Sequence, residues 1–66
     1  MATRREHRQA MREQFGDYLT VADVARYLGV NRRTAERFLE QENIEGDMIV
    51  GRKKYSAIDI ARCLAH

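Results

Sequence analysis

The stretch of residues 20–41 constrains the fold more than any other part of this chain of 66 residues. Its first part, residues 21–28, repeats apolar side chains at the spacing i, i+3, i+4 and i+7, which predicts a short helix with one buried face. Thr20 stands at the N-cap position, and Asp23 follows three residues later to complete a capping box. Gly29 suits the left-handed conformation that ends many helices. The pattern therefore predicts a sharply bounded helix followed by a tight turn.

Residues 32–41 predict a second helix, with Asn31 as its N-cap and Val30 buried between the two helices. Its apolar residues share one face, and these are Ala35, Phe38 and Leu39. The opposite face carries Arg33 and Arg37 one turn apart. Like charges at this spacing repel each other in a helix, and a polyanionic partner would account for them. The two helices and their glycine turn resemble a helix-turn-helix, in which the second helix reads DNA.

Residues 48–56 predict a β-hairpin, because β-branched and aromatic residues flank a turn that begins at a glycine. We expect strands at 48–50 and 54–56, joined by Gly51, Arg52 and Lys53. Together with Lys54, these cations either form an ordinary solvated turn or bind phosphates. The second interpretation is favoured because the hairpin follows a helix-turn-helix.

A last helix is predicted to begin after Ser56, its N-cap, with Asp59 completing a capping box. Its apolar stripe should close the core against the first two helices, and it consists of Ala57, Ile60, Ala61, Leu64 and Ala65. Arg62 lies off this stripe. It is either an exposed helix charge, which is the favoured interpretation, or a further phosphate contact.

Residues 1–14 are polar and carry several arginines, but no apolar stripe that would hold a helix to a core. We therefore expect a flexible basic arm over 1–14, in preference to a docked helix, and a folded domain over 15–66. Two interpretations of Arg4, Arg5 and Arg8 are equally supported: they follow DNA phosphates or a minor groove, or they form a solubilising tail.

The composition excludes several other classes of protein. Apolar residues make up 44% and charged residues 33% of the chain, as in a small globular domain. Cys63 alone cannot form an internal disulfide, and with His7 and His66 it has no metal-ligand spacing, so no metal or cofactor is expected. Paired carboxylates, a glycine-rich phosphate loop and a Ser/His/Asp set are all missing, so we do not expect an enzyme. No segment resembles a signal peptide or a membrane span, which predicts a cytoplasmic protein with no membrane partner.

The predicted order of elements resembles the excisionase family of winged-helix proteins, which are themselves similar to the DNA-binding domain of MerR-type regulators. The residues that carry the resemblance are YLTVADVA at 18–25, LGV at 28–30, residues 32–39, IVGRKKY at 49–55 and IDI at 58–60. The resemblance implies a mainly α fold with a small two-stranded β-hairpin, that is, a winged helix-turn-helix.

The resemblance further implies that the second helix enters the major groove of DNA and that the hairpin follows the neighbouring minor groove. In the helix, the expected DNA-binding residues are Asn31, Arg32, Arg33, Thr34, Glu36 and Arg37. In the wing, they are Arg52, Lys53 and Lys54, and further candidates are Arg4, Arg5, Arg8, Thr20 and Arg62.

Excisionases bind and bend DNA at the ends of mobile elements and promote excision by a tyrosine integrase. The expected partners are therefore double-stranded DNA, an integrase and further copies of the chain on adjacent sites, at the nucleoid of a bacterial or phage system. One alternative is a small transcriptional regulator that uses the same surface. A second is a protein-interaction module, which would expose apolar residues on the second helix where this chain has Arg33 and Arg37.

Overall fold

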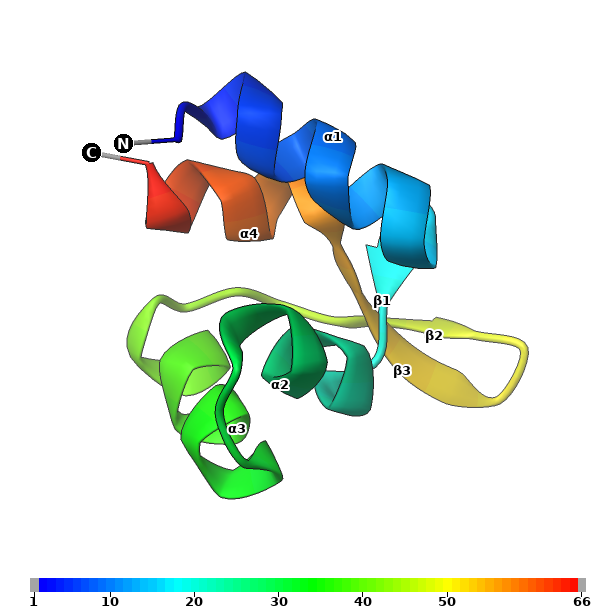
Figure 1. Cartoon of the computed structure of the whole chain (residues 1–66). Coiled ribbons are helices and arrows are strands. Elements are labelled where there is room, and N and C mark those ends of the chain that lie inside the picture. Colours follow the sequence, from blue (N-terminus) through cyan, green and yellow to red (C-terminus); the bar gives the residue numbers. More distant parts are fainter. Residues whose placement is uncertain (1, 66) are drawn as a thin grey trace.

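The computed structural model describes residues 2–65, so Met1 and His66, at the outer ends of the predicted arm and domain, lie outside the described residues. The described chain is mainly helical, with a small three-stranded antiparallel sheet in the order β1-β3-β2. Its elements are α1 (Arg4–Phe15), β1 (Tyr18–Leu19), α2 (Val21–Leu28), α3 (Arg32–Gln41), β2 (Asp47–Ile49), β3 (Arg52–Ser56) and α4 (Ala57–Leu64). In Figure 1, α1 and α4 lie together on one side of the strands, α2 and α3 lie on the other, and the β2–β3 hairpin projects beyond the helices. Within residues 2–65, no helix is long and apolar enough to cross a membrane.

The first helix shows that the prediction of a flexible arm over residues 1–14 was wrong for residues 4–14. Thr3 and Glu6 form a capping box at its start, with each backbone N–H donating to the other residue's side chain. Met11 is completely buried, and Phe15 packs against the edge of the core. One large apolar side chain is enough to dock this helix because its neighbour α4 carries small buried alanines that allow a close approach.

Helices α2 and α3 have the predicted ends. Thr20 and Asp23 form the capping box of α2, and Gly29 ends it in the left-handed conformation with φ of 71°. The Asn31 side chain accepts a hydrogen bond from the Thr34 N–H at 2.8 Å and so caps α3. The two helices and their short turn are therefore fixed by local sequence, as expected.

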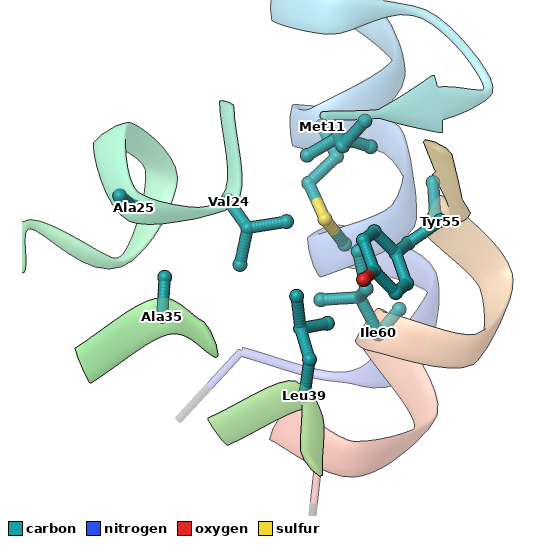
Figure 2. Packing of buried hydrophobic residues seen from close by; sticks show 10 residues of the cluster. Met11, Val24, Ala25, Ala35, Leu39, Tyr55 and Ile60 are labelled. Carbon is teal, nitrogen blue, oxygen red and sulfur yellow. The ribbon is translucent and has the colours of Figure 1, made fainter. Parts of the chain in front are cut away.

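The core forms where these two helices meet the rest of the chain. Figure 2 shows Ala25 of α2 and Ala35 of α3 lying between the two helices, which small side chains allow to approach closely. In the same view Met11 and Val24 point toward the centre of the cluster. Val30, in the turn between the two helices, is 38% exposed, so its expected burial between them was wrong.

The hairpin is present, but its turn lies one residue earlier than predicted. Ile49 pairs with Arg52, which leaves Val50 and Gly51 as a two-residue turn. Both have positive φ, 50° and 76°, as a type I′ turn requires. Arg52 and Lys53 therefore belong to β3 and not to the turn.

A third strand, β1, was not predicted. Tyr18 pairs with Ser56 and Leu19 pairs with Tyr55, so β3 is the central strand of the sheet. Leu19 is completely buried, and Tyr55 is nearly so. This short pairing joins the start of α2 to the hairpin and fixes the position of one relative to the other.

The last helix begins at the predicted N-cap but without the predicted capping box. The Ser56 side chain accepts from the Ile58 N–H, and the Asp59 carboxylate instead forms an ion pair with Arg62. The packing of α4 also differs from the prediction, because its main neighbour is α1. Ile60 still reaches the common core, so α4 closes that core together with α1.

Candidate nucleic-acid interface

The outer face of α3 presents the two arginines singled out in the sequence. Arg33 and Arg37 are exposed, and within residues 2–65 neither forms an ion pair. The opposite face of the same helix is anchored by the buried residues Ala35 and Leu39. Both guanidinium groups are thus carried by a helix whose orientation is fixed by the core, and their donors are free for an anionic partner.

The flank of α3 that faces the hairpin carries an internal ion pair. Arg32 Nε donates to Glu36 Oε1 at 3.3 Å, with both side chains more than half exposed. An exposed i,i+4 pair of this kind contributes only about 0.3 to 0.5 kcal/mol, so a phosphate can compete for Arg32. At the helix start, Asn31 uses only its oxygen in the cap, and its side-chain NH2 group keeps two donors beside the exposed Thr34.

A groove of about 570 Å³ separates α3 from the hairpin. It is lined by the start of α2, one flank of α3 and the strand β3, through Thr20, Val21, Ala22, Arg32, Glu36, Arg52, Lys53 and Tyr55. Cations stand on both sides of it, Arg32 on the helix and Arg52 and Lys53 on the strand. The carboxylate of Glu36 is offset by its pairing with Arg32, which leaves Arg52 and Lys53 as the uncompensated charges of the groove lining.

The strand β3 divides the three predicted wing cations between two faces. Lys53 lies on the same face as Tyr55, since side chains alternate along a strand, and its Nζ is 5.8 Å from the Tyr55 ring centre. Lys54 lies on the other face, opposite Asp47 in the register, and is half-buried. Arg52 shares the Lys54 face by this alternation, but at the first position of the strand its side chain still lines the groove together with Lys53.

Thr20 also lines the groove while capping α2. Its hydroxyl oxygen accepts from the Asp23 N–H at 3.2 Å, and the hydroxyl proton remains available to a phosphate oxygen. The sequence interpretation missed Val21 and Ala22, which follow this cap and form the same wall of the groove. The position of these two residues directly after an N-cap was the sequence signal that could have placed them beside the groove.

The remaining predicted contacts lie elsewhere. Arg4, Arg5 and Arg8 line a separate groove of about 650 Å³ on α1, together with Arg12, Gln9, Glu13 and Ile58. Helix α1 lies on the side of the molecule opposite α3 (Figure 1). Arg62 is on α4, paired with Asp59, and does not line the groove between α3 and the hairpin. These four arginines are therefore not brought together with Arg33 and Arg37.

Two observations bear on other chemistry. Burial raises the pKa of the Cys63 thiol, and the neighbouring Glu42 carboxylate raises it further, so the reactive thiolate is disfavoured at neutral pH. Within the described range 2–65, no three His, Cys, Asp or Glu side chains are grouped as metal ligands would be. Cys63 is thus held in the less nucleophilic form.

Comparison with known proteins adds no family assignment. No protein-family model matches the chain, and searches of curated proteins and of solved structures found no significant match. The features of the chain that bear on its function are therefore the geometry of α3, the hairpin and the groove between them.

Proposed function

We propose that this chain is a DNA-binding protein with a winged helix-turn-helix fold, in which α2 and α3 form the helix-turn-helix and the β2–β3 hairpin is the wing. In this proposal α3 enters the major groove, which at about 12 Å admits one α-helix. Arg33 and Arg37 contact base edges or phosphates there. Arg52 and Lys53 approach the backbone of the adjacent minor groove.

One observation carries the proposal: Arg32 of α3 and the cations Arg52 and Lys53 of β3 line one groove, while Arg33 and Arg37 are exposed on the same core-anchored helix. A convex cationic helix beside a cationic ribbon is complementary to a major groove and its flanking phosphate row. A protein-interaction surface would expose apolar side chains on α3, where the outermost positions hold Arg33, Arg37 and Glu40.

Within this class we favour an architectural factor of the excisionase kind, assisting a tyrosine integrase, over a small transcriptional regulator. Helix α3 has ten residues and is about 15 Å long, so one copy covers one major-groove segment and one flank. Several copies on adjacent sites would reinforce one another and hold a DNA bend, whose elastic cost is about 1 to 6 kcal/mol. The acidic connection at residues 41–47 and the arginines of α1 offer opposite charges for contacts between neighbours.

The test begins with a duplex selected by the wild-type protein from a pool of random sequences. Gel shifts on that duplex, with and without competitor DNA, measure specific binding. Circular permutation of the site and energy transfer between dyes on the two DNA ends measure bending. We expect stepwise cooperative complexes and a shortened end-to-end distance.

Two other outcomes are informative. Tight binding of one copy or one symmetric dimer without bending would favour the transcriptional regulator. Failure to select any duplex would contradict the DNA-binding proposal as a whole and leave the protein-interaction module as the better account.

A further inference from the structure

The tip of the β2–β3 hairpin combines an unusual conformation with an unusual side chain. Val50 is 96% exposed and has φ of 50°, in the left-handed region. A β-branched residue rarely adopts this conformation, because its side chain crowds the backbone. Gly51, the second turn residue, adopts its φ of 76° without this penalty. The strain is therefore confined to Val50.

No packing contact of the Val50 side chain within the fold compensates for this strain. The Val50 side chain is not part of the core, and at this exposure it is almost wholly in solvent. Asn-Gly is the sequence that suits a type I′ turn, so one substitution would relieve the strain while keeping the hairpin. Strained and exposed residues that do not support the fold point to a contact with another molecule.

The surroundings of the tip indicate the chemistry of that molecule. On β2, Met48 is 69% exposed, so the end of the hairpin has a second apolar side chain. On β3, the residues directly after the turn are the cations Arg52 and Lys53. An apolar point with cations immediately behind it is complementary to a narrow groove that has an apolar interior and anionic edges. The minor groove of duplex DNA has sugar walls between two rows of phosphates.

We propose that Val50 is an apolar wedge that enters the minor groove beside the segment bound by α3, an inference that rests on the proposed function. A two-residue turn gives the narrowest end that a hairpin can have, and Arg52 and Lys53 hold it between the phosphate rows. Apolar side chains inserted in this way partly unstack a base step and kink the duplex toward the major groove. Val50 thus promotes bending of the DNA and a preference for sites with deformable base steps, while Arg52 and Lys53 supply affinity.

The test is the substitution Val50→Asn, measured on the duplex selected by the wild-type protein. The variant should be more stable to urea, because it places Asn-Gly in the type I′ turn. Its affinity for the duplex should fall roughly tenfold, the equivalent of losing burial of one valine side chain. The slope of log affinity against log salt should not change, since no charge is removed. Energy transfer between dyes on the DNA ends should report a smaller bend.

Ile58→Asn is the matched control, because it removes another exposed aliphatic side chain from α4, on the α1 side of the molecule. It should leave affinity and bending unchanged. A Val50→Asn protein that binds and bends the duplex like wild type would overturn the wedge while the DNA-binding proposal stands. A variant that is no more stable than wild type would also overturn it, because the turn would then be unstrained. If the wild-type protein selects no duplex, the DNA-binding proposal itself is contradicted, and the wedge proposal with it.

Discussion

The ammonium nitrogen of Lys53 lies 5.8 Å from the centre of the Tyr55 ring, on the face of β3 that lines the groove. Tyr55 is buried and pairs across the sheet with Leu19 of β1. A cation beside an aromatic ring at this distance is held by a weak attraction of about 0.5 to 1 kcal/mol at an exposed site. The position of Lys53 is therefore tied to the core, although its charge is in solvent.

Lys53→Ala should weaken binding to selected and random duplexes alike, because a phosphate contact carries no sequence information. The slope of log affinity against log salt should become shallower by about 0.9 for the contact removed. Arg62→Ala is the matched control, since it removes one positive charge from α4, outside the groove between α3 and the hairpin. A slope that Lys53→Ala leaves unaltered would mean that this side chain does not reach a phosphate.

Gly46 lies directly behind the same two side chains. A Cβ at this position would stand 2.9 Å from Tyr55 Cε2 and from two carbons of the Lys53 stem. The Lys53 stem can move, but the Tyr55 ring is held in the core, so Gly46→Ala should reduce the free energy of unfolding by about 1 to 3 kcal/mol. Urea denaturation measures this change. Glu45→Ala, at the exposed neighbouring position, should have little effect, and equal stability of the two variants would contradict the close contact.

Docking of α1 makes a different prediction about stability. Met11→Ala removes a completely buried side chain and should cost about 2 to 5 kcal/mol, a large share of what a domain of this size possesses. The exposed position Gln14 provides the control substitution Gln14→Ala. If Met11→Ala were as stable as that control, residues 4–14 would behave as part of the detached arm expected from sequence.

The contrast between α1 and α2 explains what could be predicted from the sequence. Helix α2 shows two strong local signals, the Thr20–Asp23 capping box and a four-residue apolar stripe, and both its ends were predicted correctly. Helix α1 has the same kind of cap at Thr3, but its buried stripe contains only Met11 as a large aliphatic residue. Its docking depends on small residues of α4, a relationship between distant segments that periodicity within one segment cannot reveal.

The candidate site shows the same division. The outward position of Arg33 and Arg37 follows from helical geometry alone, and α3 was predicted with its cap and its inner face. The groove depends on where β3 lies relative to α3, which is fixed by the pairing of Leu19 with Tyr55. A strand of two residues has too little pattern to be recognised, so neither this pairing nor the division of Lys53 and Lys54 between two faces was predicted.

Tyr27 gives the structure a pH dependence. Its hydroxyl lies 2.8 Å from His7 Nδ1, linking α2 to α1, and burial raises its pKa above the ordinary value of 10.0. The folded state favours the neutral phenol of Tyr27, and this preference stabilises the fold. The stabilisation is complete below the ordinary pKa and is lost as the pH rises through the higher pKa of the folded state. The free energy of unfolding, measured by urea denaturation, should therefore be lower at about pH 11 than at neutral pH. The decrease should be smaller in Tyr27→Phe than in the wild-type protein. Tyr18 is 45% exposed, so Tyr18→Phe should leave the decrease unchanged. A smaller decrease in Tyr18→Phe than in Tyr27→Phe would contradict the assignment of this pH dependence to Tyr27.

Arg33 and Arg37 provide the most direct test of base recognition. Both lie on the outer face of α3, with no ion pair within residues 2–65, so nothing in the described chain competes for their donors. An arginine that donates two hydrogen bonds to guanine contributes about 1 to 3 kcal/mol of discrimination. Arg33→Ala and Arg37→Ala should therefore lower affinity for the selected duplex by more than for random DNA, with an unchanged urea midpoint. Arg62→Ala, at a paired arginine on α4, should change neither affinity. If either α3 variant lost the same factor on both DNAs, that arginine would be a phosphate contact, and sequence recognition would have to come from the other residues of α3 or from the wing.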